Sequence, residues 1–102
     1  MGTFEHENRR VVDWMESKDL EANSSPLDQL GKMAEEVGEL VAAVNGGSIS
    51  EIGDELGDVI FTACVQARLQ KLNPVDCLSR AVDKVTKRKG SWVNGSFVKQ
   101  NY

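Results

Sequence analysis

Two short acidic motifs lie close together in the chain, and their spacing suits metal-ion chemistry. They are EEVGEL and DELGDVIF, residues 35–40 and 54–61. Glu36 and Glu39 are three residues apart, as are Glu55 and Asp58, and residues three apart are neighbours on a helix surface. Four converging carboxylates would form a hard, oxygen-rich site for Mg²⁺ or Mn²⁺, and such an ion commonly binds a chain of phosphates. The alternative is a solvated acidic face, the commoner role of such residues on helices.

The elements that must position these motifs are four predicted helices and a short tail. The helices cover about 4–17, 25–45, 49–72 and 74–89, with a loop over 20–26 and a β-hairpin over 91–99. Apolar residues recur every three or four positions in each helix, Pro26 and Pro74 occupy first-turn positions, and Asn94-Gly95 favours a hairpin. The expected fold is all-α: one four-helix bundle-like domain over residues 1–102 with a C-terminal β-hairpin tail.

A tight connection, NGGSIS, joins the second and third predicted helices, so we expect an antiparallel helical hairpin. The two acidic pairs would then lie at one level and could face each other. Glu36 borders the apolar stripe of its helix, whereas Glu39 lies well outside it and needs a flank covered by another helix or subunit. Such like-charge neighbours cost roughly 0.2–0.5 kcal/mol per pair, a cost that a bound divalent cation would reverse.

Two further features predict close packing and self-association. The third helix carries a second apolar stripe opposite its first, formed by Phe61, Val65, Leu69 and Leu72. Because a short chain has few helices to cover it, this stripe predicts a homo-oligomer. Glycines also lie inside the helices, at Gly31, Gly38, Gly53 and Gly57. Each costs about 1 kcal/mol relative to alanine, so we interpret them as sites where helices pack closely.

Composition and charge narrow the functional classes. The chain has 102 residues, 40% of them hydrophobic and 27% charged, as expected for one globular domain. A net charge of −4 argues against a broad nucleic-acid surface, and no apolar run is long enough for a membrane span. The N-terminus does not resemble a signal peptide. Cys64 and Cys77 are expected to be buried, reduced thiols of a cytoplasmic protein.

The motifs and the tail together resemble a known family. EEVGEL followed by DELGDVIF matches the EExxE…ExxD signature of the MazG-like all-α nucleoside triphosphate pyrophosphohydrolases. The segments QLGKMAEEVGEL and KRKGSWVNGSFVK are similar to the short single-domain members, including phage-encoded ones, so the resemblance covers nearly the whole chain. Related all-α families include the dimeric dUTPases, the dCTP pyrophosphatases and phosphoribosyl-ATP pyrophosphohydrolase.

The resemblance implies a chemistry and a role for each acid. It implies Mg²⁺-dependent cleavage between the α- and β-phosphates of a nucleoside triphosphate, with Mn²⁺ as a substitute, by a homodimer or a dimer of dimers. The implied metal ligands are Glu36, Glu39, Glu55 and Asp58. Glu35 would be an auxiliary ligand or would orient the attacking water, so Glu35 and Glu36 are the candidate catalytic residues.

The expected substrate-binding residues are Lys32, Lys84, Lys87, Arg88 and Trp14. Lys84 and Arg88 match a Lys and an Arg that follow the second acidic motif in the family, although cations at a helix end also interact favourably with the helix dipole. Trp14 would stack on a base, or belong to the core. Val82 stands where many family members carry an Asn that contacts the nucleotide, which affects sugar or base contacts rather than the metal chemistry.

The sequence thus predicts a Mg²⁺-dependent pyrophosphohydrolase that converts a (deoxy)nucleoside triphosphate to the monophosphate and pyrophosphate, for house-cleaning or pool regulation. Two alternatives remain at this point. One is a non-catalytic helical oligomer that acts as an interaction protein. The other is a sibling enzyme that acts on phosphoribosyl-ATP.

Overall fold

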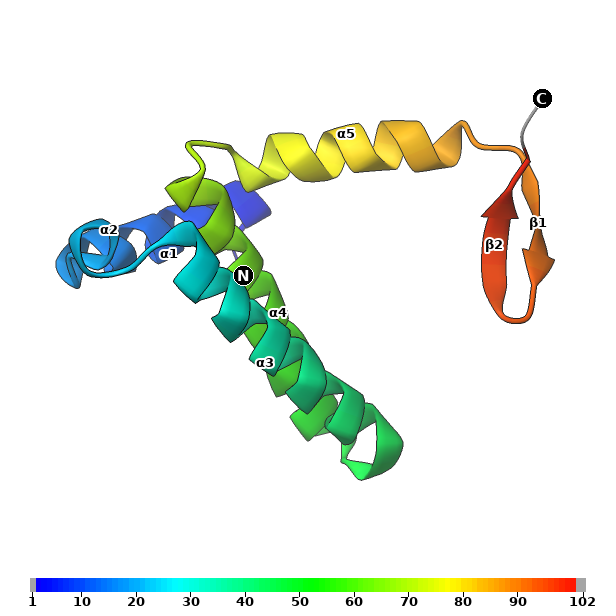
Figure 1. Ribbon diagram of the computed structural model, residues 1–102, viewed down its shortest axis with the longest axis horizontal. Coiled ribbons are helices and arrows are strands. Elements are labelled where there is room, and N and C mark those ends of the chain that lie inside the picture. The colour runs from blue at the N-terminus through cyan, green and yellow to red at the C-terminus, as the bar shows by residue number, and fades with distance from the viewer. Residues whose placement is uncertain (1, 101–102) are drawn as a thin grey trace.

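The computed structural model describes residues 2–100, so both ends of the predicted domain, residues 1 and 101–102, lie outside the described part. Five helices precede one β-hairpin (Figure 1). They are α1 (Phe4–Ser17), α2 (Leu20–Asn23), α3 (Pro26–Gly46), α4 (Ile49–Leu69), α5 (Pro74–Thr86), β1 (Gly90–Val93) and β2 (Ser96–Lys99). The mainly helical class and the C-terminal hairpin are confirmed.

An antiparallel hairpin of α3 and α4 forms the long body of the molecule (Figure 1). Ser25 caps α3 by accepting a hydrogen bond from the Asp28 N–H, and the Asp28 carboxylate accepts one from the Ser25 N–H, so the start of this helix is fixed locally. Gly47 and Ser48 make the tight turn into α4. Further along, the Gln66 side chain donates to the Pro26 carbonyl at 2.9 Å, which holds the two helices in register.

A small core lies where α1 crosses the second half of α4. It consists of Val11, Met15, Leu20, Cys64 and Val65, with Leu69 packed against it. Within this chain α1 covers Val65 and Leu69 of the second stripe, whereas Phe61 and Leu72 stay 37% and 53% exposed. The oligomer stays a prediction. The Cys64 thiol is buried as predicted, and burial raises its pKa, but Cys77 is exposed, contrary to prediction.

Three predicted boundaries were wrong, each for a local reason. The predicted loop 20–26 contains α2, which Asp19 starts by adopting a left-handed conformation with φ of 51°. The Glu21 carboxylate then ties α2 to the end of α4 by an ion pair with Lys71 at 3.1 Å. Helix α4 ends at Leu69 rather than near residue 72, because Lys71 turns left-handed with φ of 61°. Both turns occur at residues other than glycine, so the sequence does not mark them.

Helix α5 also ends earlier than predicted, at Thr86 rather than residue 89. The following residues extend into the two-stranded hairpin, where the Gln100 N–H donates to the Lys89 carbonyl at 2.7 Å. Asn94 and Gly95 have φ of 49° and 83°, the left-handed pair that a type I′ turn requires. The strands pair antiparallel from Gly90↔Lys99 to Val93↔Ser96.

A four-helix bundle does not form within one chain. Helix α5 leaves the end of α4 as an arm that diverges from the α3–α4 hairpin and carries the β-hairpin at its far end (Figure 1). None of the residues of α5 is buried. The Cα radius of gyration is 16.1 Å, against about 13 Å for a compact domain of this length. The chain is therefore markedly extended.

Much apolar surface stays uncovered in this extended chain. The accessible surface is 7704 Å², whereas a compact 11.2 kDa monomer exposes about 5,700 Å². Large apolar residues that are exposed include Leu30, Val37, Val41 and Val44 on α3, Leu56 and Ile60 on α4, and Leu78, Val82 and Val85 on α5. Several of these belong to the stripes predicted as core.

The glycines predicted to mark helix packing face open space within this chain. A Cβ atom built at Gly31, Gly38, Gly53 or Gly57 would have no neighbour within 4 Å outside its own helix turn. The close helix packing expected at these glycines is therefore absent within the single chain. In addition, no helix among the described residues is both long and apolar enough to cross a membrane.

Candidate active site

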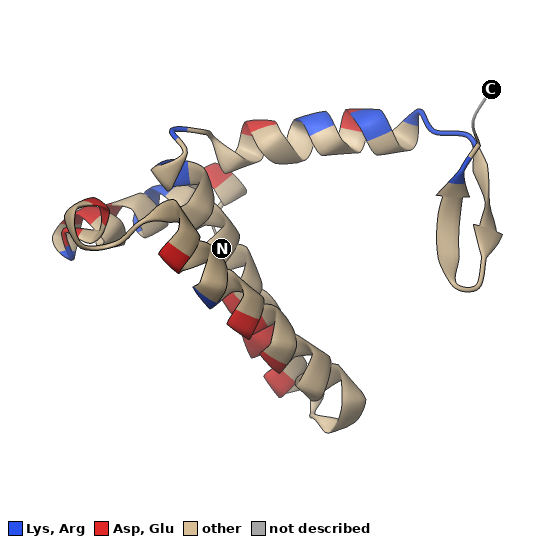
Figure 2. Ribbon diagram, viewed as in Figure 1, with Lys and Arg blue, Asp and Glu red and all other residues tan. Residues whose placement is uncertain are grey.

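Three of the predicted metal ligands converge between α3 and α4. Carboxylate oxygens of Glu36, Glu39 and Glu55 lie within 4.8 Å of one another. Glu36 and Glu39 come from successive turns of α3, and Glu55 comes from the facing part of α4. Figure 2 shows the acidic residues following the α3–α4 hairpin on adjacent turns. The predicted convergence across a helical hairpin is thus present in the structure.

Glu36 and Glu55 lie partly inside this interface, and Glu39 is exposed. The Oε2 atoms of Glu36 and Glu55 are shielded from solvent and have no hydrogen-bond partner among the described residues. An unpaired, buried carboxylate oxygen is costly. A hard divalent cation would satisfy both atoms, and the donor set consists of carboxylates alone, which suits Mg²⁺ or Mn²⁺. The residues present therefore fit such an ion.

The surroundings of the cluster raise the pKa values of two of its carboxyl groups. Burial raises the pKa of Glu36, and contact with Glu39 and the charge of Asp58 raise it further, whereas Lys32 opposes the shift. Burial likewise raises the pKa of Glu55, followed by the effects of Glu39, Asp58 and Glu36. The neighbouring carboxylates therefore make Glu36 and Glu55 harder to ionise, as expected when like charges share a site.

Asp58 and Glu35 lie beside the cluster rather than in it. Asp58 is exposed, and its carboxylate is not among the three that converge, although its charge acts on Glu36 and Glu55. Glu35 is exposed and forms an ion pair with Lys32 at 3.6 Å. Lys32 is thereby held one turn before Glu36, close enough to influence it.

A hollow adjoins the converging carboxylates and provides space for a ligand. The volume of this hollow is about 570 Å³, within the range of small-molecule sites. Glu39 and Glu55 line it together with Glu51, Asp54 and the small residues Ala42, Ala43, Gly46 and Gly47. The small side chains leave the carboxylates open to an incoming group.

The cations predicted to bind phosphate lie on the arm formed by α5 and the β-hairpin, not beside the acidic cluster. Lys84, Lys87 and Arg88 line a separate pocket of about 410 Å³ with Lys89, Lys99 and Gln100. Strand pairing places Lys99 opposite Gly90 and so brings it beside the basic end of α5, a contribution that the linear sequence did not reveal. In Figure 2 these cations lie on the arm and the acidic cluster lies on the α3–α4 hairpin. The single chain does not bring the two groups together.

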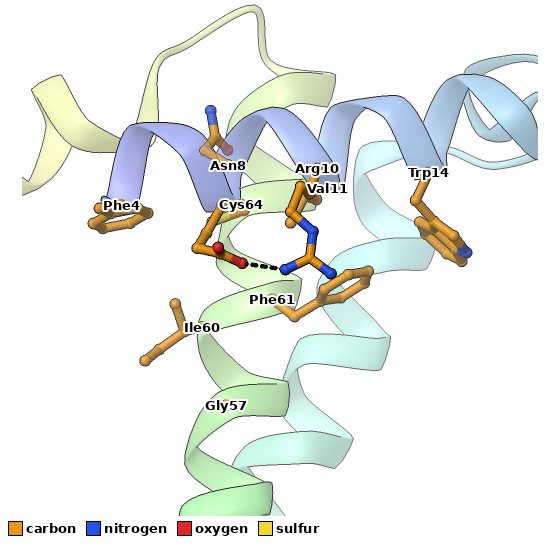
Figure 3. A pocket seen from close by; sticks show the side chains of 10 residues that line it. Phe4, Asn8, Arg10, Val11, Trp14, Gly57, Ile60, Phe61 and Cys64 are labelled. Atoms are coloured by element: carbon orange, nitrogen blue, oxygen red, sulfur yellow. Dashed lines mark hydrogen bonds and ion pairs between the residues drawn. The ribbon is translucent and has the colours of Figure 1, made fainter. Parts of the chain in front are cut away.

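Trp14 lines a third cavity of about 410 Å³, between α1 and α4. It is 42% exposed, so the alternative that it belongs to the core is not supported. Its ring packs edge-on against Phe61, with centroids 5.2 Å apart. Phe4 and Trp14 lie at opposite ends of the cavity along α1 (Figure 3). Gly57 and Ile60 line the α4 side, and the ion pair of Glu7 with Arg10 at 2.8 Å provides polar groups.

The sequence did not predict this cavity, because its walls come from α1 and α4, two distant segments of the chain. Phe61 was assigned to an apolar stripe, and Phe4, Glu7 and Arg10 carry no motif. The periodicity of α1 and α4 shows which faces are apolar, but the crossing point of the two helices determines which residues meet.

A comparison of this chain with models of protein families identifies the family to which it belongs. The model of the MazG nucleotide pyrophosphohydrolase domain matches residues 25–92, about two thirds of the chain. The chain belongs to the MazG family. The MazG match begins at the cap of α3 and ends in β1, so it includes both acidic motifs and the basic end of α5, whereas α1 and its aromatic residues lie outside it. Searches of curated proteins and of solved structures found no match. MazG membership supports pyrophosphohydrolase activity in general.

The raised pKa values give a stability prediction for the metal-free protein. We expect Glu55→Gln to raise the melting temperature at pH 7 to 8 in the presence of a chelator. A carboxyl whose pKa is higher in the folded state than in the unfolded state destabilises the fold when it is charged. This penalty is complete above the folded-state pKa and is lost as the pH falls below the unfolded value, so the difference between variant and wild type should vanish near pH 4.

Thermal unfolding followed by circular dichroism across this pH range would measure the effect. Asp54→Asn is the matched control, because Asp54 precedes Glu55 on α4 but lies outside the converging group. An equal rise in both variants would show that general charge reduction is responsible.

Proposed function

We propose that this protein is a Mg²⁺-dependent nucleoside triphosphate pyrophosphohydrolase that releases the nucleoside monophosphate and pyrophosphate, for house-cleaning or pool regulation in the cytoplasm. The observation that carries the proposal is the convergence of Glu36, Glu39 and Glu55 within 4.8 Å, with two shielded oxygens lacking partners. Family membership supports the reaction class. When bound, a divalent cation supplies charge neutralisation along the triphosphate and activation of water at neutral pH.

We assign cation binding, orientation of the attacking water and pyrophosphate binding to individual side chains of the chain. Glu36, Glu39, Glu55 and Asp58 hold the cation, with Asp58 as the outermost of the four. Glu35 is exposed beside them, so its carboxylate can accept a hydrogen bond from the attacking water and orient it toward the α-phosphorus. Lys84, Lys87 and Arg88 bind the departing pyrophosphate, and Lys32 contacts a phosphate from one turn before Glu36. No protein nucleophile is required.

The aromatic cavity takes the base in this proposal. Asp58 and Phe61 are three residues apart on α4, so they lie on neighbouring parts of the helix surface. Phe61, which lines the cavity, therefore lies about one turn beyond Asp58, the acid beside the cluster. Trp14 offers an exposed face for stacking. Stacking on an aromatic side chain contributes about 1–3 kcal/mol per base and tolerates any base.

The proposed metal site predicts which acids are essential. We expect Glu39→Gln and Asp58→Asn to lower kcat by about 10²-fold or more, because each removes a hard anionic group next to the reacting phosphates. Pyrophosphate release and circular dichroism should be measured on the same samples, with Asp13→Asn as the control that keeps activity, because Asp13 is an exposed acid of α1 away from the acidic cluster. Activity within a few-fold of wild type in either variant would remove that residue from the site.

The position of bond cleavage tests the function itself. A panel of canonical and modified nucleoside triphosphates, with phosphoribosyl-ATP included, should be assayed with Mg²⁺ in ¹⁸O-labelled water. We expect one pyrophosphate per turnover and the label in the monophosphate, because water attacks the α-phosphorus. Label in the pyrophosphate, or release of orthophosphate, would contradict the mechanism. No turnover of any substrate would instead favour a non-catalytic protein.

The base cavity predicts a selective binding defect. We expect Trp14→Ala to weaken binding of an α,β-methylene nucleoside triphosphate about tenfold, which corresponds to the loss of about 1.4 kcal/mol of stacking. Inorganic tripolyphosphate serves as the control ligand, because it has no base and should bind both proteins equally. Equal weakening for the two ligands would mean that the substitution disturbs the phosphate site or the fold.

A further inference from the structure

An ion pair between Glu7 and Arg10 forms part of the wall of the aromatic cavity between α1 and α4. Figure 3 shows Arg10 between Phe4 and Trp14, with a dashed line from its guanidinium to the carboxylate. Both partners belong to α1, so the pair does not join α1 to α4. The Arg10 and Glu7 side chains are 69% and 46% exposed, and an exposed pair contributes little to stability. Its place in the cavity wall therefore points to a role toward a ligand.

Spacing along α1 puts this pair at the edge of a base that stacks on Trp14. Arg10 comes four residues before Trp14, and Glu7 comes three residues before Arg10, so the three side chains follow one face of the helix at steps of one turn. All three line the cavity. A flat ring on the exposed face of Trp14 therefore turns an edge toward Arg10 and, one turn further, toward Glu7.

Gly57 connects the cavity to the acidic cluster. It lines the cavity, and in the sequence of α4 it stands between Glu55, one of the converging acids, and Asp58. The space that a Cβ would occupy at Gly57 is open, so a sugar can cross α4 at this point. A nucleotide with its phosphates at the acids then enters from α4, and the edge of its base that is farthest from the sugar faces α1.

The pair presents hydrogen-bond acceptors beside a fork of donors. Its own hydrogen bond joins Nη1 of Arg10 to Oε2 of Glu7 at 2.8 Å. A carboxylate has two acceptor oxygens and a guanidinium has five N–H donors in one plane, so both groups keep capacity for a ligand. Because each partner orients the other, the order of acceptors and donors along the wall is set before a ligand arrives.

Guanine is the base whose far edge complements this order. It carries two adjacent donors, the N1–H and the 2-amino group, and next to them the acceptors O6 and N7. A carboxylate accepts from both donors, and a guanidinium donates to O6 and N7, which is the commonest specific contact of arginine with a base. None of adenine, cytosine, thymine and uracil presents two adjacent donors on this edge. With those bases the pair makes fewer hydrogen bonds.

The family match separates the reaction from the choice of base. The MazG model matches residues 25–92, which contain both acidic motifs, whereas Glu7, Arg10 and Trp14 precede the match. Stacking on Trp14 tolerates any base. Discrimination between bases consequently has to come from polar groups at the edge of the ring, because a site built to form hydrogen bonds disfavours a ligand that leaves them unmade.

We propose that Glu7 and Arg10 read the edge of the base and select guanine, so that a guanine nucleoside triphosphate is the preferred substrate. The inference rests on the proposed function for the hydrolysis, whereas binding of the base does not depend on it. Water competes for an exposed pair, so we expect a preference of about tenfold over the other bases, against roughly 10⁴-fold or more at a fully buried polar site.

Quenching of Trp14 fluorescence measures base selection without catalysis. In a Trp92→Phe chain Trp14 is the only tryptophan, and a chelator is added. The probes are the monophosphates of guanosine, inosine, adenosine, cytidine and uridine, which differ only in the base. We expect the lowest Kd for guanosine monophosphate and a Kd about tenfold higher for inosine monophosphate, which lacks the 2-amino group. Equal Kd values for all bases, or tightest binding of another base, would overturn the proposal.

Two substitutions test whether the side chains touch the base. Glu7→Gln should abolish the difference in Kd between guanosine and inosine monophosphates, and Arg10→Met should abolish the difference between guanosine monophosphate and its 7-deaza analogue, which lacks N7. Asp13→Asn and Arg9→Met are the matched controls, because Arg9 and Asp13 form an ion pair on the same helix outside the cavity, at 3.1 Å. Both controls should keep the full preference. A guanine preference that survives in Glu7→Gln and in Arg10→Met would contradict the inference.

Steady-state hydrolysis distinguishes this inference from the proposed function. If the wild type hydrolyses nucleoside triphosphates with the same kcat/KM for every base, the proposed function stands and the selection of guanine is wrong. If it hydrolyses no triphosphate, but binds guanosine monophosphate most tightly and loses that preference in Glu7→Gln, the proposed function is wrong and the guanine site stands.

Discussion

Packing of α3 against α4 brings like charges together, and the remaining features of the candidate site depend on this contact. Glu36, Glu39 and Glu55 approach within 4.8 Å, and burial raises the pKa values of Glu36 and Glu55 before any neighbouring charge acts. The capped start of α3, the short turn at Gly47 and the Gln66–Pro26 hydrogen bond fix the register of the two helices. The apolar contacts of the hairpin therefore hold the carboxylates at a distance that they would not adopt alone. A rigid pair of helices suits a metal site, because the ligands are positioned before the ion arrives.

The small core explains the extended shape of the chain. Among the described residues, the buried cluster lies between α1, α2 and the second half of α4, and α5 buries nothing. Most of the apolar surface of α3 and α5 consequently faces outward. Burial of a large apolar side chain stabilises a protein by roughly 1.5–3 kcal/mol, so these faces represent stabilisation that the isolated chain does not use. The oligomer stays a prediction, and the faces of α3 and α5, with Phe61 and Leu72 of α4, are the apolar surface that it would bury.

Local signals in the sequence predicted the helix starts and the β-hairpin well. Contacts between distant segments of the chain could not be predicted from it. Ser25, Pro26, Pro74 and the Asn94-Gly95 turn each act within a few residues, so the helix starts and the β-hairpin could be read directly. The ends at Asp19 and Lys71 were missed because a left-handed turn at a residue other than glycine has no clear signature. At the site, the three-residue spacing pointed to four carboxylates, of which Glu36, Glu39 and Glu55 converge and Asp58 lies beside them. The aromatic cavity and the position of Lys99 depend on the crossing of α1 over α4 and on strand register, which periodicity does not specify.

Separation of acids from cations has an energetic consequence for ligand binding. Within one chain the carboxylates repel one another, and so do the cations that gather at the end of the arm. A metal–triphosphate ligand that contacted both groups would relieve both repulsions and add charge-assisted contacts to each. A ligand that binds only the form in which the two groups meet stabilises that form by mass action. Substrate binding would then favour the arrangement that brings the acids and the cations together.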